Sequence, residues 1–130
     1  MVKPRQGDIY WVRFGVSRDS GPSGKRPAIV IQNNLLNISG INTTVVALLT
    51  SNLKLGQIPG NVSLLKGTAN LAKASVVVVS QIATVDKNRL IEKIGTLSSE
   101  KIKDVIKGCQ MVISLSFFSS RLVAAKPQRH

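Results

Sequence analysis

Histidine and carboxylate side chains are scarce in this sequence, and their scarcity excludes several kinds of active site. The 130 residues include six Asp and Glu and one histidine, His130, at the last position. A Ser–His–Asp triad and a paired-histidine metal site are therefore excluded. The carboxylates form no close pair of the kind that hydrolyses glycosidic bonds. We expect no metal and no other cofactor.

The chain is also poor in cysteine and in long apolar segments. Its single cysteine, Cys109, excludes an internal disulfide and a multi-cysteine zinc site. Apolar stretches such as Val45–Leu49 and Val76–Val79 are far shorter than the roughly 20 residues that cross a bilayer. The charged N-terminal segment Met1–Asp8 leads into no apolar core of the kind that signal peptides carry. These features predict a cytoplasmic protein without a membrane partner.

Positive charge, in contrast, is abundant. Eighteen Lys and Arg give a net charge of +12 and a pI of about 10.6. Such an excess favours a polyanionic partner, whether a nucleic acid, an acidic protein or an anionic surface, and the simpler alternative is a solvated cationic surface. A chain of this length with 43% hydrophobic residues can bury the core of one globular domain.

Short apolar, β-branched segments alternate with loops rich in Gly, Pro and basic residues, which is typical of a sheet of short strands. The predicted strands cover residues 8–14, 28–32, 43–50, 61–65, 75–85 and 90–95. Ser98 is a typical helix N-cap, and an apolar stripe at helical spacing follows it at Ile102, Val105, Ile106, Cys109, Val112 and Ile113. The pattern predicts a mainly β (α+β) fold, a small twisted sheet or barrel with a C-terminal helix. Residues 1–116 are expected to form one domain and 117–130 a basic C-terminal tail.

Polar side chains stand where the predicted strands meet loops. Lys25–Pro27 lies between a loop of small residues and an apolar strand, Thr50–Asn52 closes another strand, and Gln81 interrupts a third. A rigid strand end beside a loop is a common place for a functional group. Taken singly, a surface charge, an edge hydroxyl and a buried amide are the simpler interpretations of these sites.

Six segments carry a more specific pattern when they are read in order. They are Gly7–Trp11, Gly24–Asn33, Leu48–Asn52, Pro59–Val62, Asp86–Lys87 and Arg89–Leu90. Together they resemble the MazF/PemK toxin family, the endoribonuclease halves of bacterial toxin–antitoxin pairs. The resemblance runs in the same order from about Gly7 to Leu115.

The resemblance implies a small SH3-like β-barrel of the CcdB/PemK type with a C-terminal helix, assembled as a homodimer. It also implies that Arg26, in the Arg-Pro step, and Thr50, at the end of its strand, are catalytic. The family cuts single-stranded RNA without metal, by attack of the substrate's own 2′-hydroxyl, and leaves a 2′,3′-cyclic phosphate and a 5′-hydroxyl. A guanidinium that grips phosphate oxygens and a hydroxyl donor suit this chemistry.

RNA contacts are expected from the basic loops and from the polar residues at the strand ends. The expected RNA-binding residues are Arg18, Lys25, Ser51, Asn52, Lys54, Lys73 and Gln81, with Asn52 and Gln81 as base readers. The partners implied are single-stranded RNA, a cognate acidic antitoxin whose disordered segment lies across the RNA site, and operator DNA through that antitoxin.

Two positions depart from the family pattern. Many relatives carry an acidic residue in the loop before the Arg-Pro step, where this chain has Ser20–Pro22, and a basic residue after Gln-Ile, where it has Ala83. The resemblance therefore does not carry a cleavage sequence over to this chain.

Two other functions stay open beside the nuclease. The same basic surface suits a nucleic-acid-binding barrel without catalysis, and a CcdB-like relative of this fold poisons DNA gyrase by protein contact. The Arg26–Thr50 pair favours the nuclease, because a pure binder needs no hydroxyl beside that arginine. A gyrase poison would be expected to use the end of its helix, where this chain offers only Ser114–Phe118 and the basic tail.

Overall fold

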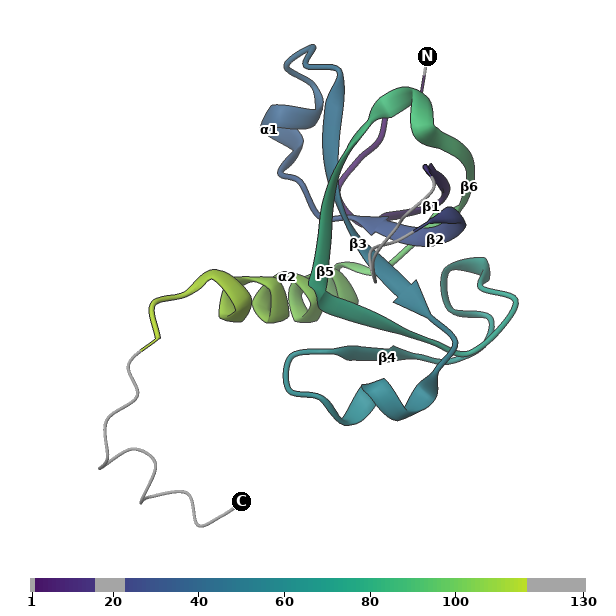
Figure 1. The fold of residues 1–130 in the computed structure, drawn as a ribbon, viewed down its shortest axis with the longest axis vertical. Coiled ribbons are helices and arrows are strands. Elements are labelled where there is room, and N and C mark those ends of the chain that lie inside the picture. Colours follow the sequence, from purple (N-terminus) through teal and green to yellow (C-terminus); the bar gives the residue numbers. More distant parts are fainter. Residues whose placement is uncertain (1, 16–22, 117–130) are drawn as a thin grey trace.

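A computed structural model describes residues 2–15 and 23–116, and these form one curled antiparallel sheet with two α-helices (Figure 1). Along the chain, the elements are β1 (Asp8–Phe14), β2 (Gly24–Val30), α1 (Asn34–Asn37), β3 (Thr43–Thr50), β4 (Val62–Leu64), β5 (Ser75–Asp86), β6 (Leu90–Thr96) and α2 (Ser99–Ile113). Short 3-10 turns lie at η1 (Leu53–Gln57), η2 (Thr68–Asn70) and η3 (Lys87–Arg89). The strand order is β4-β5-β3-β2-β1-β6, so the sheet is a half-barrel whose edges are β4 and β6.

The predicted mainly β fold with a C-terminal helix is confirmed, and the strands at 8–14 and 43–50 have the predicted bounds. The second strand differs, because it begins at Gly24 and not at Ala28. Its first half pairs with β1 alone, with Arg26 opposite Val12, while β3 pairs only from Ala28 onward. Such a one-sided stretch is where a sheet tolerates a proline, which explains why Pro27 lies inside the strand.

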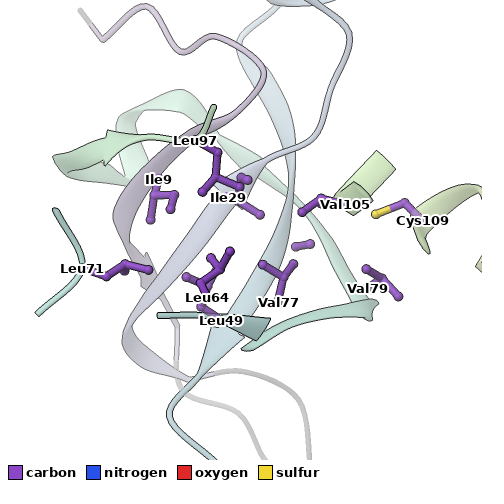
Figure 2. Packing of buried hydrophobic residues seen from close by; sticks show 11 residues of the cluster. Ile9, Ile29, Leu49, Leu64, Leu71, Val77, Val79, Leu97, Val105 and Cys109 are labelled. Carbon is purple, nitrogen blue, oxygen red and sulfur yellow. The ribbon is translucent and has the colours of Figure 1, made fainter. Parts of the chain in front are cut away.

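The segments Ala28–Val30 of β2 and Val46–Leu49 of β3 are apolar because both of their faces are buried. One face, with Ile29 and Leu49, packs under α2 in the cluster of Figure 2, and the other face, with Ala28 and Leu48, lies inside the curl of the sheet. Alternate residues therefore enter alternate cores, and neither face has room for polar positions. This result confirms the prediction that the strand after Pro27 is buried on both sides.

A wide bulge divides β5 into two halves. Leu48 of β3 pairs with Val78, but the preceding Ala47 pairs with Ile82, so Val79–Gln81 has no partner on β3. The strand bends there, and α2 crosses it beside the bend (Figure 1). The predicted strand over 75–85 is confirmed as β5, but its bulge was not predicted.

Helix α2 begins as predicted, because the Ser98 side chain accepts a hydrogen bond from the Lys101 amide at 3.3 Å. Its apolar stripe is only partly buried. Val105 and Cys109 enter the core, but Val112 and Ile113 are 42% and 79% exposed. The predicted apolar stripe is therefore present, but its last turn is exposed to solvent.

The buried Cys109 thiol is part of this core. Burial raises its pKa, since a thiolate is poorly solvated among apolar side chains, and its role is therefore packing. Among the described residues, no helix is long and apolar enough to cross a membrane. Residues 117–130, which include the predicted tail, lie outside the described part of the chain.

Candidate active site

A cavity of about 310 Å³ opens at the end of the sheet where β2 and β3 diverge. Its walls come from β1, β2, the end of β3, the segment between η2 and β5, and β6. The lining residues are Trp11, Arg26, Pro27, Leu49, Thr50, Ser51, Asn70, Leu71, Ala72, Lys73, Ser75 and Ile94. Four of the residues predicted from the sequence, Arg26, Thr50, Ser51 and Lys73, therefore meet in one place.

Arg26 is half-buried in the one-sided stretch of β2. No carboxylate forms an ion pair with it within residues 2–15 and 23–116, where the single salt bridge joins Lys93 to Asp8. A guanidinium that no described carboxylate neutralises can accept an external anion, and its planar fork matches two oxygens of a phosphate.

Thr50 is the last residue of β3, and its hydroxyl has a defined orientation. The Oγ1 atom accepts a hydrogen bond from the Asn52 amide at 3.1 Å. One lone pair is thereby occupied, which leaves the hydroxyl proton to be donated to a ligand in the cavity. The chain turns immediately after the strand because the Asn52 side chain caps η1, where it accepts from the Lys54 amide at 3.3 Å. The segment Thr50–Asn52 is thus the end of a strand followed by a turn that side-chain hydrogen bonds stabilise.

The cationic residues around the cavity differ in position. Lys73 lies on its wall. Lys25 lies at its rim, with its ammonium group 5.1 Å from the centroid of the Trp11 ring, which itself lines the cavity. This cation–π contact holds a positive charge on the strand that carries Arg26.

Other predicted RNA contacts are not in the cavity lining. Asn52 lies immediately before η1 and Lys54 lies within it, and both side chains are exposed. Gln81 is on the bulge of β5 and is exposed, so the alternative of a buried amide is wrong. Arg18 belongs to residues 16–22, outside the described part of the chain.

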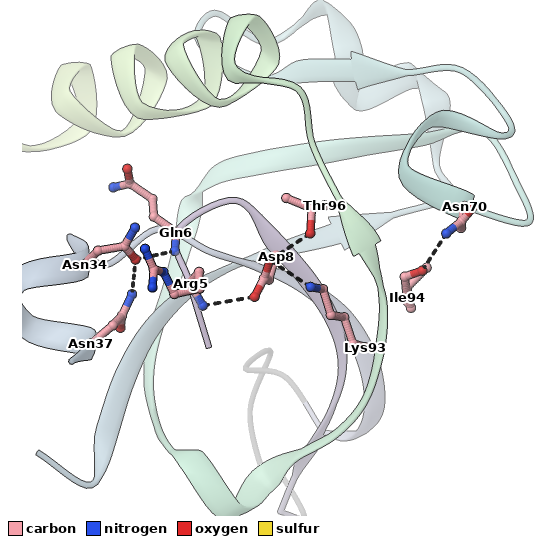
Figure 3. Close-up of polar contacts among 9 residues, drawn as sticks. All are labelled: Arg5, Gln6, Asp8, Asn34, Asn37, Asn70, Lys93, Ile94 and Thr96. Atoms are coloured by element: carbon pink, nitrogen blue, oxygen red, sulfur yellow. Dashed lines mark hydrogen bonds and ion pairs between the residues drawn. The ribbon is translucent and has the colours of Figure 1, made fainter. Parts of the chain in front are cut away.

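The cavity lining also contains residues that were not predicted as site residues, among them Trp11, Asn70 and Ile94. Trp11 carried a signal, because it is the one tryptophan and stands in a strand beside the Arg-Pro segment. Asn70 and Ile94 carried none, since their position depends on how η2 packs against β6, where the Asn70 Nδ2 donates to the Ile94 carbonyl at 3.2 Å (Figure 3).

Metal-ligating side chains are not grouped anywhere in the described ranges, which contain no cluster of three His, Cys, Asp or Glu residues. The cavity itself is lined by a guanidinium, an ammonium, hydroxyls, an amide and apolar side chains. These groups can bind, orient and neutralise a phosphate ester and can donate protons to its oxygens.

Residues 5–113 match the family of PemK-like, MazF-like toxins of type II toxin–antitoxin systems. The chain belongs to this family. It is 36% identical over 110 residues to the endoribonuclease MazF2 of Mycobacterium bovis, covering 85% of this chain and 96% of the relative. The endoribonuclease MazF of Staphylococcus saprophyticus is equally similar, at 36% over 111 residues, or 85% and 92% of the two chains.

Solved structures support the same fold for this toxin. MazF from Deinococcus radiodurans superposes with a TM-score of 0.71 at 21% identity, covering 87% of this chain and 98% of that one. A mycobacterial endoribonuclease in complex with its cognate antitoxin gives a TM-score of 0.71 at 19% identity, covering 88% and 98%. These structures confirm the predicted fold, and the family match with the relatives at 36% identity confirms the predicted family.

Proposed function

We propose that this toxin is a metal-independent endoribonuclease that cuts single-stranded RNA. The observation that carries the proposal is the shared cavity of Arg26, Thr50, Ser51 and Lys73 in a chain whose relatives are named endoribonucleases. The net charge of +12 supports a polyanionic substrate.

In the proposed reaction, the 2′-oxygen of the substrate attacks the adjacent phosphorus and its proton is lost to solvent. The bond from phosphorus to the 5′-oxygen then breaks. The products are a 2′,3′-cyclic phosphate and a 5′-oxygen that takes up a proton to become a hydroxyl. The substrate supplies its own nucleophile, so the protein has to orient the ester and stabilise charge.

In this proposal, Arg26 binds the phosphate and Thr50 donates a hydrogen bond to it. The Arg26 fork holds the non-bridging oxygens and polarises the leaving 5′-oxygen, because a guanidinium stays protonated at neutral pH. The Thr50 hydroxyl, oriented by the Asn52 amide, donates to the charge that develops on phosphorus-bound oxygen. Lys73 and Lys25 add positive charge on two sides of the site.

The RNA strand extends from the cavity over exposed basic residues. Lys25 and Lys54 are exposed near it, on β2 and η1, and their ammonium groups suit phosphates on either side of the scissile one. Asn52 and Gln81 stay proposals as base readers, and neither lines the cavity.

We infer that the toxin acts in the cytoplasm as a homodimer held inactive by an acidic antitoxin. Exposed apolar side chains on α1, directly after it and at the end of α2, among them Leu35, Ile38 and Ile113, support self-association. One solved relative is a complex with its cognate antitoxin. An acidic, flexible antitoxin segment would compete with RNA for the cationic cavity, and the antitoxin would connect the pair to operator DNA.

The test is incubation of the purified toxin with mixed-sequence RNA in EDTA, followed by sequencing of the new ends. We expect cleavage to persist and to yield cyclic phosphate and 5′-hydroxyl termini. Activity that EDTA abolishes would overturn metal independence. Binding without cleavage would indicate a non-catalytic barrel, and inhibited DNA supercoiling with intact RNA would indicate a gyrase poison.

A further inference from the structure

The turn that forms one wall of the cavity has an unusual backbone. Ala69 and Asn70 have φ values of +50° and +65°, and they are the two non-glycine residues with positive φ in the described ranges. Asparagine tolerates this left-handed region, whereas alanine does so at a cost. Strained turns that persist beside an active site are held there by their surroundings.

Strand β6 holds this turn in place. The Asn70 Nδ2 donates to the Ile94 carbonyl at 3.2 Å (Figure 3), and the carbonyl of Ala69 packs so closely on Gly95 that a Cβ there would collide with it. The turn is therefore fixed on the same strand that supplies the Ile94 wall.

The hydrogen bond to Ile94 also determines how the Asn70 amide is oriented. A backbone carbonyl only accepts, so the NH₂ group must face Ile94 and the Oδ1 atom must face elsewhere. In the part of the chain that the structure describes, no donor reaches Oδ1. Asn70 is exposed and lines the cavity, which makes Oδ1 a fixed acceptor available to a ligand.

The surroundings of this acceptor suit a nucleobase. Apolar surfaces of Trp11, Leu71 and Ile94 line the same cavity, whose volume of about 310 Å³ is at the lower end of ligand pockets. Aromatic and apolar walls contact the faces of a base, while a side-chain amide reads its edge. Arg26 and Thr50 are in the same lining, so a base held here belongs to a nucleotide beside the scissile phosphate.

We propose that Asn70 is a specificity residue that selects a base with an exocyclic amino group next to the scissile bond. The proposal rests on the nuclease function proposed above. Adenine, cytosine and guanine each offer an amino donor to Oδ1. Uracil has none, and its single N3–H lies between two carbonyl oxygens that repel the acceptor.

The test compares the wild type with Asn70→Gly, which keeps the positive φ and removes the acceptor. Both are given randomised RNA, and the new ends are sequenced. We expect the wild type to disfavour uracil at one position flanking the cut, and Asn70→Gly to reduce this discrimination roughly 3- to 10-fold, the usual range for one hydrogen bond. Removing the amino group from the selected base should slow the wild type by a similar factor and leave the variant unaffected.

Two further variants separate base reading from loss of turn structure. Asn70→Asp keeps an acceptor and tolerates the same backbone but cannot donate to the Ile94 carbonyl, so its acceptor is no longer fixed and the discrimination against uracil should fall as it does in Asn70→Gly. Ala69→Gly loosens the same turn without touching the cavity lining, and its cleavage profile should match the wild type. Discrimination lost equally in Ala69→Gly, or a wild type that prefers uracil on both sides of the cut, would overturn the role of Asn70. If the wild type cuts no RNA, the nuclease proposal itself fails.

Discussion

Arg26 is the residue whose chemistry is hardest to replace, because a fork of two N–H groups does what a point charge cannot. We expect Arg26→Lys to lower kcat by about 10²–10³-fold, comparable to the loss of an oxyanion donor in other enzymes. Thermal unfolding should change little, since the guanidinium makes no internal ion pair in the described ranges.

The matched control for this variant is Arg13→Lys. Arg13 is exposed on β1 opposite Lys25 and does not line the cavity, so its kcat should stay within about twofold of wild type. Full activity of Arg26→Lys in a cleavage time course would contradict the phosphate-clamp role.

The role of the Thr50 hydroxyl can be tested by substitution with valine, because valine has nearly the same shape and lacks only the hydroxyl. We expect Thr50→Val to lower kcat by about 10²-fold or more, and Thr50→Ser to recover most of it, because serine can accept from the Asn52 amide and donate to phosphate. Equal activity of the valine and serine variants in single-turnover cleavage would exclude a donor role.

The catalytic roles of Arg26 and Thr50 were predicted from the resemblance to the MazF/PemK family, and their place where an apolar strand meets a polar segment agreed with it. Trp11 and Asn70 were not predicted as cavity residues, and the reason is physical. Whether a strand residue faces a core or a cavity depends on its neighbouring strands, and β1 gains its second neighbour, β6, only through pairing between the two ends of the domain. Local pattern contains no information about that pairing.

At the scale of elements, the contact between α2 and the sheet depends on two glycines. The backbone of Gly60 approaches Gly108 so closely that a Cβ on Gly108 would collide with the Gly60 carbonyl. We expect Gly108→Ala to destabilise the fold, since overpacking costs about 1–3 kcal/mol and the gain in helix propensity is about 1 kcal/mol. Urea unfolding measures the difference.

The exposed neighbour Lys107 provides the control for this helix. Lys107→Ala also changes a side chain to alanine in α2 but meets no backbone, and its free energy of unfolding should stay within about 0.5 kcal/mol of wild type. A stabilised Gly108→Ala would mean that α2 can shift away from β5 at little cost.

Elements were predicted well where hydrophobic pattern decides them and poorly where pairing does. The apolar segment of β3, the apolar stripe of α2 and the Ser98 cap could each be recognised from the local sequence. The early start of β2 and the bulge in β5 are consequences of which strand lies alongside, since the ladder is one-sided before Ala28 and interrupted opposite Ala47. Neither leaves a mark in local propensity.

At the scale of the whole molecule, binding of RNA should depend steeply on salt. The affinity for an uncleavable RNA analogue should fall linearly on a logarithmic salt plot, and Lys54→Ala and Lys73→Ala should each reduce the slope by about 0.7, the value for one phosphate of a single strand. Filter binding or fluorescence anisotropy measures it.

Lys103→Ala is the control for this series, because Lys103 is exposed on α2 and lies outside the cavity lining. Its slope should equal that of the wild type. A reduction in all three variants alike would indicate that the net charge of the molecule, and not a track beside the cavity, determines binding.

The pairing of β1 with β6 has a consequence for how the protein folds during its synthesis on the ribosome. Asp8 pairs with Thr96, and the cavity needs walls from Trp11 through Ile94. While β6 is still in the exit tunnel, the η2 turn lacks its contact with Ile94. The cavity then also lacks the wall that Ile94 supplies. Since domains fold as units during synthesis at about 5–20 residues per second, the nascent chain stays catalytically incomplete until almost all of the domain has emerged. We therefore expect that a nascent toxin does not cleave the mRNA from which it is being translated.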